Sequence, residues 1–193
     1  MMRRPPPLKG LIDAVDATRN PWGLSYALLA YGMAVRDVDP ARALDALRRG
    51  LVIAQDSGNR GSESRLATIL CRLEAQYGDP LAAFGYLAVA VRNFHDAGNT
   101  TMIRFPLAVL AAFFDRLGRD EPAAIIAGFA FSPLTSAAYP ELSTVIAHLR
   151  EVLGDQPYES LALKGETMST TAMVTYAYDQ IDQARTELKA VVK

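Results

Sequence analysis

The sequence PARALDALRRGLVIAQDSGN (residues 40–59) recurs in altered form forty residues later as PLAAFGYLAVAVRNFHDAGN (residues 80–99). Both copies open with proline, carry a leucine at the eighth place (Leu47 and Leu87), and close with Asp-x-Gly-Asn. A weaker third copy follows, in which Ala123 and Ala130 stand where the earlier copies have small residues. Self-similarity at a period of 20–50 residues is typical of stacked supersecondary units. The sequence therefore predicts a repeat protein.

The spacing of apolar residues is helical throughout, and no segment alternates convincingly enough to indicate a strand. We expect an all-α fold: a tetratricopeptide-like α-α superhelix of about three helix pairs plus C-terminal capping helices. The expected division is a tail and short helix (1–20, the helix at about 8–19 after a polyproline-like lead), three helix pairs (21–131, at about 21–59, 60–99 and 100–131), and capping helices of the same domain (132–193).

Local signals predict where single helices begin and which faces they bury. Ser62 or Ser64 is expected to cap the first helix of the second pair, and Thr100 or Thr101 to begin the third pair. Two apolar stripes mark the buried faces of the C-terminal helices. They consist of Leu142, Val145, Ile146, Leu149, Val152 and Leu153, and of Met173, Ala177, Ile181, Ala184 and Leu188.

The composition excludes several classes of function. The chain has 193 residues, a net charge of −1, one cysteine (Cys71) and two histidines (His95 and His148). A single cysteine allows no internal disulfide and no thiolate metal cage, and it fits a reducing cytosol. The balanced charge offers no basic field for nucleic acid, and no apolar run is long enough for a membrane helix. We expect a cytoplasmic protein without cofactor, metal ion, direct nucleic-acid contact or membrane contact.

Small residues at fixed places resemble the tetratricopeptide repeat. Counted from the turn residues Val38, Gly78 and Gly118, they lie five and twelve places later: Ala43/Gly50, Ala83/Ala90 and Ala123/Ala130. Seven places before the turn stand Tyr31, Cys71 and Ala111, so Tyr31 departs from the small residue usual there. The period of forty also exceeds the usual thirty-four, which suggests longer helices or a different crossing angle.

Six segments carry a second resemblance: NPWGLSYAL (20–28), DPARALDALRRGL (39–51), RFPLAVLAAFFDRLG (104–118), HLREVLGD (148–155), GETM (165–168) and YAYDQI (176–181). They resemble the C-terminal helical region of actinobacterial, especially mycobacterial, regulators. In these a cyclase-like or ATPase module precedes tetratricopeptide-like helices, and some relatives end in a LuxR-type DNA-binding domain. The resemblance implies a noncatalytic sensing or interaction module of a signalling or transcriptional regulator, as an excised domain or a stand-alone relic. The G-x-x-x-x-G-K-[ST] phosphate loop does not occur.

The tetratricopeptide resemblance implies a binding groove on the concave face, lined by the first helix of each pair. Arginines there suit a carboxylate or phosphate, because their planar donors can bind two oxygens at once. The expected ligand is a protein or peptide partner or a small anionic effector. Ordinary surface pairing of these arginines with Glu63, Glu74 or Asp115 remains the alternative. The candidate groove residues are Arg36, Arg65, Thr68, Arg72, Gln76, Asp115 and Arg116.

Other functions stay open on weaker grounds. No catalytic constellation is visible, so the sequence favours a protein that is not an enzyme; an enzyme with a site on the concave face is one alternative, and a stand-alone oligomerisation scaffold is another. His95 and His148 are expected to be structural, and Cys71 to be a packing residue. A homodimer is a further option, through large residues of the last helix such as Met173, Tyr176 and Tyr178.

Overall fold

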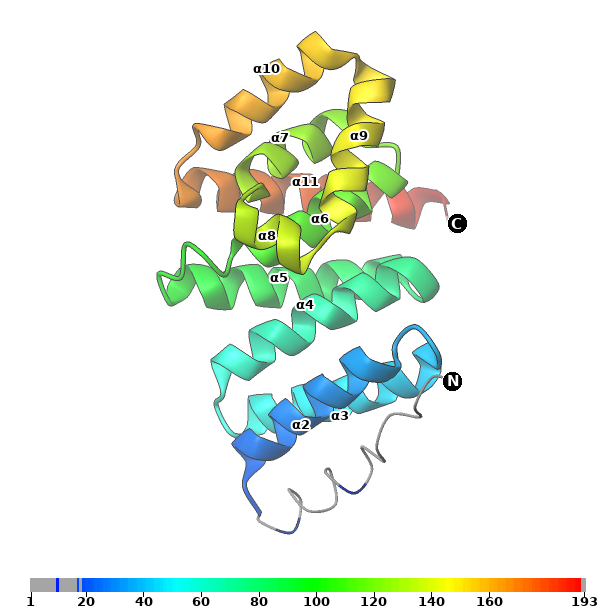
Figure 1. The fold of residues 1–193 in the computed structure, drawn as a ribbon, viewed down its shortest axis with the longest axis vertical. Coiled ribbons are helices and arrows are strands. Elements are labelled where there is room, and N and C mark those ends of the chain that lie inside the picture. Colours follow the sequence, from blue (N-terminus) through cyan, green and yellow to red (C-terminus); the bar gives the residue numbers. More distant parts are fainter. Residues whose placement is uncertain (1–9, 11–16, 18, 192–193) are drawn as a thin grey trace.

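The computed structural model describes residues 19–191 together with Gly10 and Ala17, so the short helix and polyproline lead expected before residue 19 lie outside the described residues. From residue 19 to residue 191, every regular element is an α-helix, which confirms the all-α prediction for this part of the chain. The helices are α2 (Pro21–Val35), α3 (Pro40–Asp56), α4 (Arg60–Tyr77), α5 (Pro80–Asp96), α6 (Arg104–Arg116), α7 (Asp120–Ala130), α8 (Pro133–Ala138), α9 (Glu141–Leu153), α10 (Asp155–Glu166) and α11 (Thr170–Val191) (Figure 1).

The first six of these helices form three hairpins. α2 packs against α3, α4 against α5 and α6 against α7, and the hairpins rise one after another along the long axis of the molecule (Figure 1). Their second helices begin at Pro40, Pro80 and Asp120, which keeps the forty-residue period. The small residues at the repeated places are all buried, because the helix backbones approach closely there: Ala43, Gly50, Ala83, Ala90, Ala123 and Ala130.

Asparagine caps begin the first helices of the first two hairpins. The Asn20 side chain accepts hydrogen bonds from backbone N–H groups at the start of α2. Asn59 Oδ1 accepts one from Ser62 N at 3.1 Å, so α4 begins at Arg60. The prediction that Ser62 or Ser64 caps α4 is wrong: Ser64 lies inside the helix, and its hydroxyl donates to the carbonyl of Arg60 at 2.7 Å.

α6 begins at Arg104, later than the predicted start at Thr100 or Thr101. Pro106 lies in the first turn of α6 and has no N–H to donate to the carbonyl four residues before it, so regular helix cannot extend further back. The preceding turn is closed by Asn99, whose side chain accepts a hydrogen bond from Met102 N at 3.0 Å.

The core is built from the faces that the hairpins turn towards one another. Leu47, Leu66 and Leu70 are fully buried between the first two hairpins. Phe84 and Phe113 join the second hairpin to the third, with ring centroids 4.5 Å apart. Burying a side chain of this size stabilises the fold by about 1.5–3 kcal/mol. Cys71 is also fully buried, and burial raises the pKa of its thiol to about 12. This matches the prediction that Cys71 is a packing residue.

α10 lies directly against α7, backbone to backbone. Gly128 of α7 faces the backbone of Ala162, and Gly165 of α10 faces the backbone of Ile125. A Cβ atom at Gly165 would stand 1.8 Å from the Ile125 carbonyl oxygen. Glycine is therefore required at both crossing points, since any side chain would push the two helices apart.

α11 lies across the long axis of the molecule and packs on α5 and α7 (Figure 1). Its predicted stripe is buried as far as Ala184, with Met173 and Ala177 fully inaccessible, and Leu188 is half-buried. On α9, Leu142, Val145 and Leu149 of the predicted stripe are buried and Ile146 and Leu153 are half-buried, but Val152 is exposed, so that part of the prediction is wrong. The Tyr178 hydroxyl donates to the carbonyl of Ala88 at 3.0 Å. Met173 is thus fully buried inside the chain, whereas Tyr178 is half-buried, with its hydroxyl bound to α5.

Of the helices described between residues 19 and 191, none is sufficiently long and apolar to cross a membrane.

Candidate functional site

Three of the candidate arginines lie near Tyr139, just before the start of α9. Arg36 ends α2, Arg72 lies in α4, and Arg116 ends α6, so each comes from the first helix of a different hairpin. All three charges act on Tyr139, which is 6% exposed. Burial raises the pKa of the Tyr139 hydroxyl, and the charges of Arg72, Arg116 and Arg36, all close enough to act on it, oppose that rise. We call these three arginines with Tyr139 the arginine site.

The N-terminal end of α9 covers part of the face that carries the arginine site. The Arg72 guanidinium lies over the Tyr139 ring, 5.1 Å from its centroid, and forms an ion pair with Glu141 at the start of α9. Burial lowers the pKa of Arg72, and the nearby charge of Arg36 lowers it further. The structure thus places a carboxylate of the same chain where the sequence predicts an external ligand.

The remaining candidate residues do not join the arginine site. Arg65 and Gln76 are exposed, and within residues 19–191 neither makes a side-chain hydrogen bond or ion pair that ties it to Tyr139. Thr68 is buried, and its hydroxyl donates to the carbonyl of Ser64 at 2.7 Å, so it is satisfied by its own helix. Asp115 binds His148 instead of an arginine.

The carboxylates considered as ordinary partners for these arginines are used elsewhere. Glu63 accepts hydrogen bonds from Gln55 and Asn93. Glu74 is paired with Arg48 at 2.6 Å and also accepts a hydrogen bond from Asp79 N. The alternative of surface pairing with Glu63, Glu74 or Asp115 is therefore not what the structure shows.

The pair of His148 and Asp115 gives a testable pH dependence. Asp115 Oδ1 lies 2.7 Å from His148 Nδ1, and this hydrogen bond raises the pKa of His148 above its ordinary value of 6.5. Because the folded pKa is raised, the stabilisation is complete below the unfolded pKa and is lost as pH rises through the folded pKa. We expect Asp115→Asn to lower the titration midpoint of His148, measured by NMR of its ring protons. An unchanged midpoint would show that the pair does not form in solution.

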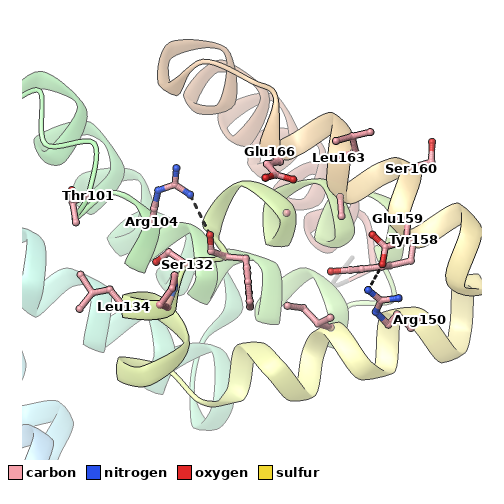
Figure 2. A pocket seen from close by; sticks show the side chains of 15 residues that line it. Thr101, Arg104, Ser132, Leu134, Arg150, Tyr158, Glu159, Ser160, Leu163 and Glu166 are labelled. Carbon is pink, nitrogen blue, oxygen red and sulfur yellow. Dashed lines mark hydrogen bonds and ion pairs between the residues drawn. The ribbon is translucent and has the colours of Figure 1, made fainter.

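A second candidate surface is a cleft at the far end of the stack, with a volume of about 1190 Å³. α8 and α9 form one wall, α10 forms the other, and the end of α7 with the start of α6 lies beneath (Figure 2). α9 and α10 diverge from the corner at Gly154 (Figure 1); we call the end of the cleft next to this corner the narrow end and the opposite end the wide end. Its lining comprises Thr101, Arg104, Gly128, Phe131, Ser132, Pro133, Leu134, Ile146, Arg150, Tyr158, Glu159, Ser160, Ala162, Leu163 and Glu166.

Ionic contacts fix the narrow end of the cleft. Arg150 of α9 pairs with Asp155 at 3.2 Å and with Glu159, and its guanidinium lies 4.6 Å from the centre of the Tyr158 ring. These contacts bridge the two walls, as Figure 2 shows for Arg150 and Glu159. They hold α9 and α10 together next to the corner.

The wide end is built differently. Arg104 donates to the carbonyl oxygens of Phe129 and Phe131 and lies over the Phe129 ring, so it binds the carboxyl end of α7. Glu166 is exposed on the opposite wall and forms no ion pair with any residue between 19 and 191. The wide end therefore carries one guanidinium (Arg104), bound to backbone carbonyls, and one exposed carboxylate (Glu166) that forms no ion pair, beside apolar side chains.

The sequence does not predict this cleft. Nothing in the spacing of the apolar residues of α10 shows that this helix folds back onto α7. Gly128 and Gly165, which lie inside α7 and α10, are a signal for this contact, because an isolated glycine in a helix often has a packing reason.

Over residues 19–191 no group of three or more His, Cys, Asp or Glu side chains is arranged to hold a metal ion. The chain shows no significant match to any protein-family model, curated protein or solved structure. The resemblance to actinobacterial regulators therefore rests on the quoted sequence segments alone.

Proposed function

We propose that this chain is a noncatalytic, tetratricopeptide-like helical-repeat module that binds a partner protein, as part of a bacterial signalling or transcriptional regulator. The observation that supports binding most directly is the cleft between α8, α9 and α10. The regulator context is supported by the segments quoted in the sequence analysis. The superhelical arrangement is supported by the three hairpins and their common period.

The cleft suits an apolar segment of protein better than a small molecule. Its volume of about 1190 Å³ exceeds the usual range for small-molecule pockets. Three large apolar side chains at its edge are more than half exposed: Phe131 (52%), Leu134 (54%) and Leu163 (59%). Exposed apolar residues that gather at one hollow, unlike single ones, mark interaction sites.

The charge at the wide end defines the partner further. Glu166 forms no ion pair with any residue between 19 and 191, whereas Asp155 and Glu159 at the narrow end both pair with Arg150. An amphipathic helix laid between the diverging walls would bury its apolar stripe on Leu134 and Leu163 and could place a lysine or arginine next to Glu166. The proposed partner segment is therefore an amphipathic helix with a basic residue beside its apolar stripe.

Selection from a displayed library of random 16-residue peptides tests this proposal. Wild-type protein should enrich peptides with apolar residues at helical spacing and a basic flank. Leu163→Glu should weaken binding of a selected peptide by at least about tenfold, because it puts a charge into the apolar contact. The measurement is fluorescence anisotropy of the labelled peptide.

Val52→Glu is the matched control, since Val52 is 54% exposed but lies on α3, outside the cleft. It should leave peptide binding unchanged. Equal loss in both variants, or enrichment of no peptide at all, would contradict a docking role for the cleft. Turnover of a nucleotide, ester or peptide by the purified protein would contradict the noncatalytic part of the proposal.

A further inference from the structure

The arginine site carries more positive charge than the surrounding carboxylates neutralise. Arg72 has the carboxylate of Glu141. Arg36 has only the solvent-exposed Asp37, whose Oδ2 lies 3.5 Å from Arg36 Nε. Arg116 forms no ion pair within residues 19–191 and lies over the Phe113 ring, 5.8 Å from its centre. Only two carboxylates, Glu141 and the solvent-exposed Asp37, therefore form ion pairs with the three guanidinium groups of the arginine site in residues 19–191.

The site also holds an unused donor. Arg36 Nε is buried from solvent yet donates no hydrogen bond, despite its ion pair with Asp37. A buried donor without an acceptor is costly, so such groups usually have a partner in the functional state. Arg36 and Arg72 are also close enough to repel each other. An added anion would satisfy the donor and relieve the repulsion.

We propose that Arg36, Arg72 and Arg116 form a binding site for a phosphate-class dianion, and that Glu141 competes with that dianion for Arg72. Glu141 already shows that an oxyanion fits against Arg72. A phosphate group has three or more acceptor oxygens and up to two charges, so it can bridge guanidinium groups on three helices, which one carboxylate cannot do. This site is separate from the cleft and does not depend on the proposed function.

The competition predicts effects of opposite sign. Arg116→Gln should weaken phosphate binding by about tenfold, because it removes one charge-assisted donor group; Arg116 is exposed, so the fold should survive. Glu141→Gln should strengthen binding several-fold, because it removes the competing charge. Isothermal titration calorimetry with inorganic phosphate at constant ionic strength measures both, and thermal unfolding checks that each variant is folded.

Glu151→Gln is the matched control, because it removes the same charge from the exposed side of α9. It should leave phosphate binding unchanged, as should Leu163→Glu in the cleft. Glycerol 2-phosphate, compared with inorganic phosphate, distinguishes a phosphate monoester from free phosphate as the ligand. The proposal is overturned if phosphate does not bind, if succinate binds as tightly, if Arg116→Gln has no effect, or if Glu141→Gln fails to increase affinity beyond the control.

Discussion

Replacing Gly165 by alanine is expected to destabilise the protein by about 3 kcal/mol. The new Cβ would stand 1.8 Å from the carbonyl oxygen of Ile125, and this neighbour is backbone, which cannot rotate away as a side chain can. Overpacking in a tight contact commonly costs about 1–3 kcal/mol, and a clash with backbone belongs at the upper end. Chemical denaturation in urea, followed by circular dichroism, gives the change in free energy of unfolding.

Gly85→Ala is the matched control, because Gly85 also lies inside a helix but a Cβ atom added there would meet no neighbouring atom within 4 Å. Alanine there should stabilise the protein by about 0.5–1 kcal/mol, the usual difference between alanine and glycine in a helix. If Gly165→Ala were as stable as wild type, α10 could not lie against α7 as the structure shows, and the cleft would lose one wall.

The hairpins were predictable because their signals are local and repeated. Pro40 and Pro80 open helices, Gly58 and Gly98 follow helix ends with positive φ, and Ala43 and Ala83 mark close approach of two helices. Each signal depends on only a few neighbouring residues. Because the same signals occur in two repeats, both repeats predict the same helix pair. Caps were less predictable, since Asn59 resembled a turn residue and only its hydrogen bond to Ser62 N identifies it as the cap of α4.

The candidate site was predictable only in part, for a physical reason. Counting back from the turn of each repeat selected Arg36, Arg72 and Arg116, because helix periodicity fixes which residues of a helix share a face. In the structure all three lie near Tyr139. The ion pair of Arg72 with Glu141 joins residues from two distant helices, and no period in the sequence encodes it. Thr68 was a weak candidate for the binding site from the sequence alone, because the hydroxyl of a buried threonine in a helix commonly donates to the carbonyl four residues back.

The contact of α10 with α7 is of the same long-range kind. Its direction depends on the corner at Gly154, whose φ of 86° turns the chain back after α9. Periodicity reports which face of α10 is apolar, but not which helix it meets. The cleft follows from that meeting and from α8 (Pro133–Ala138), which the sequence did not predict, so the sequence did not show the cleft.

Arg48→Ala is expected to destabilise the protein by about 2–3 kcal/mol, because it leaves the Glu74 carboxylate buried without its cation. Glu74 is 3% exposed, and Arg48 Nη2 lies 2.6 Å from its Oε1. Removing one partner of a buried pair typically costs about 3–5 kcal/mol. The value here should be smaller, since Arg48 is half exposed and Glu74 keeps a hydrogen bond from Asp79 N.

Arg42→Ala serves as the matched control on the same helix, because Arg42 pairs with Asp39 where both side chains are exposed. It should cost less than about 0.5 kcal/mol, as exposed pairs do. Adding Glu74→Gln to Arg48→Ala should recover part of the loss, because the neutral amide no longer needs a cation. Urea unfolding of Arg42→Ala, Arg48→Ala, Glu74→Gln and the double variant measures this coupling. If Arg48→Ala and Arg42→Ala cost the same, Glu74 is solvated in solution, and the contact of α3 with α4 is looser than the structure shows.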